Sequence, residues 1–253
     1  MPPNPTTWLN AALARLSDAL IPPVCLSCQK RLHDHDTLCA VCWRDVHFIG
    51  PPLCDALGLP MPYDTGGKVL SARAIAHPPA YQRARAVARY DGPLRTMVHR
   101  FKYADRHDAR VLFGRWLVQA GGELLRDADV VVPVPLAGMR LWVRRYNQAA
   151  VLAHEVGRLT GVPVAPLALR RMRRTRPQVG LTAAQRRQNV AGAFKVMERA
   201  ASRVRGRRVV LVDDVITTGA TVEACAQALL RAGAAQVDVL ALGLVTGDTG
   251  PTA

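Results

Sequence analysis

From about residue 83 onward, the chain alternates short apolar runs with longer amphipathic segments. A short apolar run predicts a strand buried in a sheet, whereas apolar residues spaced three or four positions apart predict a helix. The predicted strands are 85–90, 130–134, 208–212 and 237–242, and the predicted helices are 91–103, 108–126, 147–159 and 218–231. This alternation predicts an α/β domain with a largely parallel sheet flanked by helices.

The segments outside this pattern differ from one another. Residues 6–20 carry apolar side chains at helical spacing and predict a short amphipathic helix that ends before Pro22. We expect this helix to pack on its own domain, with a partner or a membrane surface as the alternatives. Residues 51–80 contain Pro-Pro and Gly-Gly pairs and predict a linker or irregular loop. Residues 173–189 are polar and rich in arginine, and predict an exposed loop or short helix.

Four cysteines near the N-terminus form two CxxC pairs. Cys25 and Cys28 are separated by ten residues from Cys39 and Cys42, a spacing typical of a tetrahedral zinc site with four thiolates. Four protein ligands leave no open coordination position, so the predicted zinc is structural rather than catalytic. The alternatives are redox or uncommitted thiols, and replacement of one cysteine by a nearby histidine. The candidate histidines are His33 and His35.

The positive charge is concentrated in one part of the chain. The net charge is +15, and residues 140–208 hold 17 basic and two acidic side chains, which accounts for all of it. Nearly all of these basic residues are arginines, whose guanidinium groups match the geometry of phosphate. The segment therefore predicts an anionic partner, either a polyphosphate ligand or a nucleic acid. The alternative is a solvated basic surface.

We expect a cytoplasmic protein without a membrane span. No stretch approaches the roughly 18 uninterrupted apolar residues of a membrane helix. The N-terminus lacks a basic region, and Arg15 and Asp18 interrupt its apolar stretch, which is atypical of a signal peptide. In a reducing compartment, the six cysteines serve as metal ligands or buried thiols rather than disulfides.

The most informative stretch is 209–221, with the sequence VVLVDDVITTGAT. An apolar strand is followed by Asp213 and Asp214, and then by a loop of small polar residues that opens a helix. Unpaired N–H groups and the helix dipole make such a loop an anion site, and glycine allows close approach of the backbone. Two carboxylates beside a phosphate make chemical sense if they accept hydrogen bonds from a diol or hold Mg²⁺ through water. The alternative, helix capping, explains one such residue but not two acids followed by this loop.

The stretch 209–221 resembles the signature of type I phosphoribosyltransferases. The resemblance implies a phosphoribosyltransferase-like fold, a Rossmann-like parallel sheet flanked by helices, over residues 81–246, with a tail at 247–253. It further implies that Asp213 and Asp214 bind the ribose hydroxyls of phosphoribosyl pyrophosphate, which would be bound with Mg²⁺. The residues that would surround the 5-phosphate are Thr217, Thr218, Gly219, Ala220 and Thr221.

Further segments occur in the order typical of the ComF family, which includes competence proteins and GntX-like proteins. They are the four-cysteine module within residues 1–50, YDGPLRTMVHRFKY, VVPVPL, RLWVRRYNQA and RRTRPQVGLTAAQRRQNVAGAF. The resemblance implies that Val134 and Pro135 belong to a pyrophosphate-binding loop. It also implies that Arg145 and Arg174 flank the ligand cleft or its hood. A third CxxC element of the family is reduced here to Cys54, which argues against a second metal site.

Three functions are consistent with these observations. The first is a phosphoribosyltransferase with an unknown acceptor. The second is a DNA-handling protein in natural transformation, which binds single-stranded DNA and acts with competence or recombination proteins. The third is a sensor that binds phosphoribosyl pyrophosphate without turnover. Ligand binding without turnover would distinguish the third from the first, and a steep salt dependence of binding would support the second.

Overall fold

The computed structural model describes residues 22–64, 66–103, 109–136, 146–172, 185, 190 and 192–246. The predicted helix at 6–20 lies outside these residues, as do Arg145 and Arg174 and nearly all of the arginine-rich segment 173–189. Among the described helices, none combines the length and the apolar character needed to cross a bilayer.

The described chain contains eight helices and six strands. The helices are α2 (Ala40–Arg44), α3 (Ala72–Ala76), α4 (Gly92–Tyr103), α5 (Ala109–Ala120), α6 (Gly122–Arg126), α8 (Gln148–Thr160), the 3₁₀ helix η1 (Glu198–Arg203) and α10 (Ala220–Arg231). The strands are β1 (Ala84–Arg89), β2 (Val130–Pro133), β3 (Leu169–Arg171), β4 (Phe194–Val196), β5 (Arg208–Ile216) and β6 (Gln236–Leu244). The four predicted strands and their flanking helices are thus present, while the short hairpin β3–β4 was not predicted.

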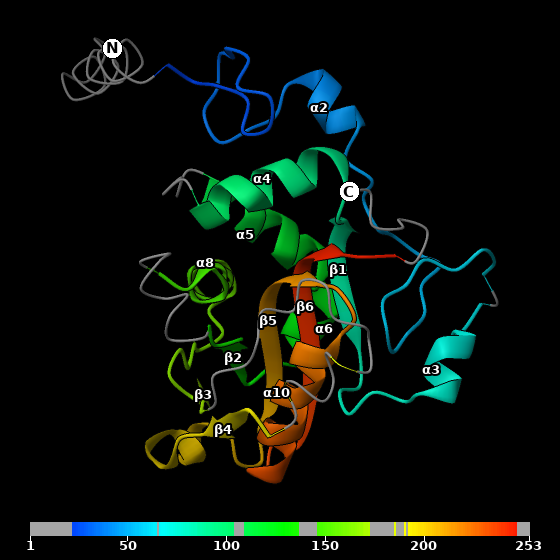
Figure 1. The fold of residues 1–253 in the computed structure, drawn as a ribbon, viewed down its shortest axis with the longest axis vertical. Coiled ribbons are helices and arrows are strands. Elements are labelled where there is room, and N and C mark those ends of the chain that lie inside the picture. The colour runs from blue at the N-terminus through cyan, green and yellow to red at the C-terminus, as the bar shows by residue number, and fades with distance from the viewer. Residues whose placement is uncertain are drawn as a thin grey trace, which may run out of the picture.

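The central sheet is parallel and has the strand order β1-β6-β5-β2. Alternate residues of β5 enter the two hydrophobic cores. Val209 and Leu211 face the core that includes α10 and the β3–β4 hairpin, while Val210 and Val212 face the core that includes α4, α5 and α8. Burial on both faces explains the unbroken apolar sequence of this strand. The predicted α/β architecture is confirmed (Figure 1).

The predicted helix 108–126 is divided into α5 and α6 at Gly121. A Cβ atom at this position would lie 2.7 Å from Cδ2 of Leu240 on β6. The chain therefore approaches the sheet too closely for a side chain, and helix geometry breaks where it does so. The hydrophobic pattern continues across the break, which explains why the sequence suggests one helix.

The four-cysteine module packs on the face of the sheet that α4 and α5 cover. Cys25, Leu26, Leu38, Cys42 and Val46 belong to the same buried cluster as α4 and α5 (Figure 1). The aromatic rings of Trp43 and Phe48 also contact Trp116 of α5. The module is therefore part of the main core rather than a separate unit.

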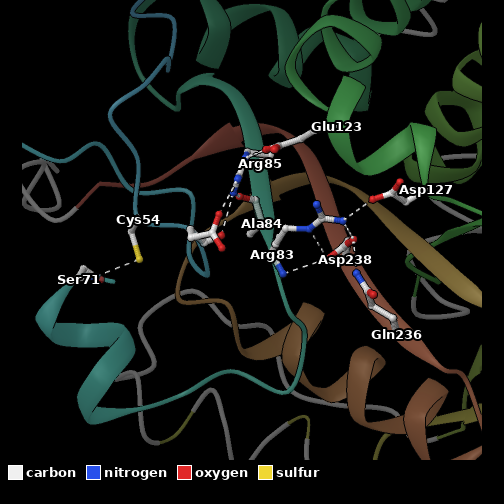
Figure 2. Close-up of polar contacts among 10 residues, drawn as sticks. Cys54, Ser71, Arg83, Ala84, Arg85, Glu123, Asp127, Gln236 and Asp238 are labelled. Atoms are coloured by element: carbon white, nitrogen blue, oxygen red, sulfur yellow. Dashed lines mark hydrogen bonds and ion pairs between the residues drawn. The ribbon is translucent and has the colours of Figure 1, made fainter. Parts of the chain in front are cut away.

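The segment 51–80, for which we expected a linker or irregular loop, contains α3 and two isolated bridges, Leu53–Pro60 and Cys54–Val69. Arg85 of β1 is buried and anchors this segment to the sheet. Its guanidinium donates hydrogen bonds to the carbonyl and the carboxylate of Asp55 and also contacts Glu123 of α6 (Figure 2). A neighbouring ion pair joins Arg83, the residue before β1, to Asp238 of β6.

Candidate functional site

The four predicted zinc ligands come together in the structure. One side-chain sulfur from each of Cys25, Cys28, Cys39 and Cys42 lies within 4.8 Å of the others, and the sulfurs of Cys28 and Cys39 are 3.7 Å apart. A tetrahedral site with Zn–S bonds of about 2.3 Å has sulfur–sulfur distances of about 3.8 Å, so the cluster fits zinc. His33 and His35 do not belong to this cluster. The structure therefore favours four cysteines over a mixed ligand set.

Backbone donors support the cysteine cluster. The N–H of Cys39 donates to Sγ of Cys25 at 3.3 Å, and the N–H of Cys42 donates to Sγ of Cys39 at 3.4 Å. Such donors stabilise thiolate sulfur, the form that binds zinc. A zinc ion here would stabilise the module and, through the shared core, the position of α4 and α5.

The signature loop, residues 217–221, follows β5 and includes the start of α10. Strand β5 extends beyond the predicted end at Val212, because Asp213, Val215 and Ile216 continue to pair with β6. Asp213 and Asp214 therefore lie inside β5, near its C-terminal end, rather than after the strand. Gly219 is the N-cap of α10, with a φ of 82°, and Oγ1 of Thr218 accepts the N–H of Ala220 at 3.5 Å. The positive φ explains the glycine.

The two aspartates differ in environment. Nζ of Lys102 lies 2.9 Å from Oδ2 of Asp214, and both side chains are largely buried, with 15% and 14% exposure. The N–H of Asp214 donates to Oδ1 of Asp213 at 2.8 Å. Burial and the neighbouring Asp214 charge nevertheless raise the pKa of Asp213 to about 8. The pair thus carries a proton at neutral pH. Lys102 forms an ion pair with Asp214 rather than with Asp213.

The Val134–Pro135 loop adjoins the same edge of the sheet. The N–H of Val134 donates to the carbonyl of Val212 at 2.9 Å, and Nδ2 of Asn147 donates to the Val134 carbonyl at 3.0 Å. Asn147 also caps α8 by accepting the N–H of Ala149. Val134 therefore lies beside Val212, the residue that precedes Asp213.

The stretch Tyr146–Gln148 holds the end of α4 at this site. The Tyr146 hydroxyl donates to the Phe101 carbonyl, and Nε2 of buried Gln148 donates to the Lys102 carbonyl at 3.3 Å. These contacts place Lys102 beside Asp214. The sequence analysis gave no partner for either side chain.

Sequence reasoning missed the contacts that the segment 71–81 makes with the signature loop. Nη2 of Arg73 donates to the Thr218 carbonyl at 3.1 Å, although the two residues are 145 positions apart. Arg73 and Tyr81 also line a cavity of about 40 Å³ together with the loop residues Thr217, Thr218 and Gly219. No local signal in a proline- and glycine-rich segment could have identified these contacts.

A second cavity of about 1140 Å³ lies elsewhere in the described chain. Its lining includes Trp43, Phe48 and Trp116, together with Arg85 and Leu125. It shares no lining residue with the signature loop, so its size does not bear on the phosphate site.

Curated relatives match nearly the whole chain. DNA utilization protein YhgH of Salmonella typhimurium is 35% identical over 228 residues, which cover 88% of this chain and 97% of the relative. Competence protein F of Haemophilus influenzae is 30% identical over 224 residues, which cover 86% of this chain and 95% of the relative. The chain belongs to the ComF family. The resemblance stated from the sequence is thereby confirmed.

Two domain families also match this ComF-family chain. A double zinc ribbon domain matches residues 16–74, and a phosphoribosyl transferase domain matches residues 126–245. The zinc ribbon match includes all four cysteines of the cluster, and the phosphoribosyl transferase match includes the whole signature loop. Among solved structures, glutamine phosphoribosylpyrophosphate amidotransferase from B. subtilis is 27% identical over 55% of this chain and 29% of that chain, with a TM-score of 0.38.

Proposed function

We propose that this chain binds phosphoribosyl pyrophosphate with Mg²⁺ and acts in competence or DNA utilization in the cytoplasm. The observation that carries the ligand proposal is the signature loop. Gly219, with its positive φ, opens α10 three residues after β5, a strand that carries the two aspartates near its C-terminal end. The loop offers backbone donors for the 5-phosphate, and the aspartates offer acceptors for the two ribose hydroxyls.

The surrounding residues have compatible roles. Val134, whose N–H donates to the Val212 carbonyl of β5, and Pro135 are proposed to contact the pyrophosphate of the same ligand. Mg²⁺ bound with the ligand would supply positive charge to the pyrophosphate, and Asp213 and Asp214 are the carboxylates available to hold it through water. Lys102 forms an ion pair with Asp214 and holds this carboxylate in place beside the loop before the ligand binds. Arg145 and Arg174, which lie outside the described residues, are proposed to contact the pyrophosphate.

Calorimetry with phosphoribosyl pyrophosphate and Mg²⁺ tests the ligand proposal. We expect the zinc-loaded protein to bind, and an Asp213→Asn/Asp214→Asn double variant to lose binding by about 100-fold or more, since two charged hydrogen-bond acceptors are removed. Equal binding by the two proteins would contradict the assignment of the aspartates. Release of pyrophosphate from the bound ligand would indicate a transferase, and binding without release would indicate a sensor.

The β3–β4 hairpin and η1 favour a nucleic acid as a second partner. Arg170 and Lys195 lie directly opposite each other on the two strands, and both side chains are exposed. Like charges opposite one another destabilise a hairpin, so their placement makes sense if an anion binds there. The exposed arginines that follow on η1 and toward β5 are Arg199, Arg203, Arg205 and Arg207.

Single-stranded DNA is the nucleic acid we propose, in keeping with the names of the relatives and with competence or recombination proteins as partners. An Arg170→Glu/Lys195→Glu variant should bind single-stranded oligonucleotides more weakly and show a shallower dependence of affinity on salt than the parent protein. The control is Arg44→Glu, because Arg44 is exposed but lies in the cysteine module. An unchanged salt dependence in the hairpin variant would exclude this surface.

A further inference from the structure

The segment 71–81, which begins within the residues that the double zinc ribbon domain matches, contacts the signature loop. Nη2 of Arg73 on α3 donates to the Thr218 carbonyl at 3.1 Å. A second contact lies one turn further into α10, where the carboxylate of Glu223 accepts the N–H of Ala80 at 3.0 and 3.2 Å. Two separate hydrogen bonds thus join this segment to the loop and to the first turn of the helix that follows it.

The contact of Arg73 controls the direction of a peptide group. In a trans peptide, the carbonyl of one residue and the N–H of the next point in opposite directions. Because the Thr218 carbonyl is turned toward Arg73, the N–H of Gly219 is turned away from α3. Gly219 has a φ of 82°, so this peptide can rotate more freely than one flanked by two ordinary residues. An external hydrogen bond is therefore an effective way to hold it.

Tyr81 lies on the same side of the loop. Its side chain is buried, and its hydroxyl would lie 3.9 Å from a Cβ atom placed on Gly219. Burial and the nearby Glu223 carboxylate raise the pKa of Tyr81 to about 12, so the hydroxyl stays neutral at physiological pH. Tyr81 therefore limits movement of Gly219 toward α3 without adding a charge beside the loop.

The segment that carries Arg73 is itself held in place. Sγ of Cys54 accepts the N–H of Ser71 at 3.2 Å, and Oγ of Ser71 caps α3 by accepting the N–H of Ala74 at 3.3 Å. Figure 2 shows the Cys54–Ser71 contact near the pairs that Arg85 makes with the neighbouring segment. Cys54, left over after the four zinc ligands are assigned, thus has a structural role at the start of α3.

We infer that Arg73 is a positioning residue for the phosphate-binding loop, which holds the Thr218–Gly219 peptide with its N–H directed to the side where the 5-phosphate binds. The ligand part of this inference rests on the proposed function. The segment that follows the four-cysteine cluster thereby supports the ligand site. The conformation of the loop before the ligand binds depends on α3.

Hydrogen exchange in the ligand-free protein tests the positioning role. Arg73→Met removes the donor and keeps much of the aliphatic side chain, whereas Arg73→Lys keeps a donor that can reach the same carbonyl. We expect the amide of Glu223, whose N–H donates to the Gly219 carbonyl at 2.9 Å, to exchange several-fold faster in Arg73→Met and at nearly the parent rate in Arg73→Lys. The control is Arg44→Met, which removes an exposed arginine of the cysteine module and should leave the loop unchanged.

Titration with ribose 5-phosphate tests the consequence for binding. We expect Arg73→Met to bind about tenfold more weakly, a change of about 1.4 kcal/mol, while Arg73→Lys recovers most of the affinity. Zinc content and the melting temperature should stay at the parent values in both variants, since Arg73 is exposed and outside the cores.

The outcomes separate the two proposals. Parent-like exchange at the Glu223 amide in Arg73→Met overturns the positioning role, whatever the ligand does. Parent-like affinity for ribose 5-phosphate in Arg73→Met also overturns it, while the proposed function stands. Faster exchange in Arg73→Met together with no binding by the parent protein supports the positioning of the loop and contradicts the proposed ligand.

Discussion

At the scale of single residues, the site depends on how charges are paired. Asp213 and Asp214 are adjacent in sequence and share one environment, but Lys102 pairs with Asp214 alone. Burial of Asp213 and the neighbouring Asp214 charge both disfavour its ionised form, and the pKa of Asp213 rises as a result. Ligand binding at this pair is therefore expected to be linked to protons.

The pKa of Asp213 predicts that binding becomes tighter as the pH rises. Below about pH 8 the free protein carries a proton on Asp213. Binding of the ribose hydroxyls needs the carboxylate as an acceptor, so the proton is released when the ligand binds. The affinity for phosphoribosyl pyrophosphate should thus increase from pH 7 to pH 8, by up to about tenfold per unit, and level off above it.

Calorimetry in two buffers with different ionisation enthalpies measures this proton directly. Close to one proton should be released per ligand at pH 7 and almost none at pH 9. The range from pH 7 to pH 9 lies above the second pKa of a phosphate ester, about 6, so the ligand itself releases few protons. An affinity that does not vary from pH 7 to pH 9 would refute the linkage.

The same pKa gives the sign of its effect on stability in the absence of ligand. The folded protein binds a proton on Asp213 that the unfolded chain, with an ordinary carboxyl pKa of 3.8, has already lost at pH 5. The free energy of unfolding therefore falls as the pH rises from about 4 to about 8 through this group. In Asp213→Asn, that part of the pH dependence should be absent from denaturant-unfolding curves.

At the scale of elements, close packing decides where the helices end. The hydrophobic pattern of residues 108–126 suggests one helix, and the structure divides it at Gly121, where the backbone meets Leu240 of β6. Similarly, β5 is longer than its apolar run, because its pairing with β6 continues through the aspartates to Ile216. Pairing partners far away in sequence set both boundaries.

Substitution of adjacent glycines tests this explanation of the helix break. A Cβ atom on Gly121 would lie 2.7 and 2.8 Å from the two terminal carbons of Leu240, whereas nothing lies within 4 Å of one on Gly122. Gly121→Ala should lower the free energy of unfolding by about 1–3 kcal/mol. Gly122→Ala should leave it unchanged or raise it by up to about 1 kcal/mol. Equal effects in denaturant unfolding would contradict the packing argument.

At the scale of the whole molecule, the four-cysteine module and one face of the sheet share a hydrophobic core. Cys25 and Cys42 are buried in the cluster that also contains Phe101 and Phe113 of α4 and α5. Residue 102, which pairs with Asp214, directly follows Phe101. Loss of the metal should therefore affect the ligand site as well as the module.

Zinc removal is expected to destabilise the entire chain. Cys28→Ser should lower the zinc content and the melting temperature together. A loss of about 3 kcal/mol, small for a structural zinc site, corresponds to about 6–12 °C in a protein of this size. His33→Ala is the matched control, because His33 lies between the two cysteine pairs but outside the sulfur cluster. Melting unchanged by Cys28→Ser would show that the module is not part of the cooperative core.

The sequence by itself determined the features that depend on neighbouring residues. Hydrophobic periodicity determined the parallel α/β class, cysteine spacing determined the zinc cluster, and the stretch 209–221 determined the candidate ligand loop, because each is a local pattern with one dominant structural solution. Only the tertiary structure decided which side chains act together. The pairs Lys102–Asp214 and Arg73–Thr218 and the break at Gly121 join residues more than 100 positions apart. Such contacts arise from how the elements pack, and no short-range pattern records them.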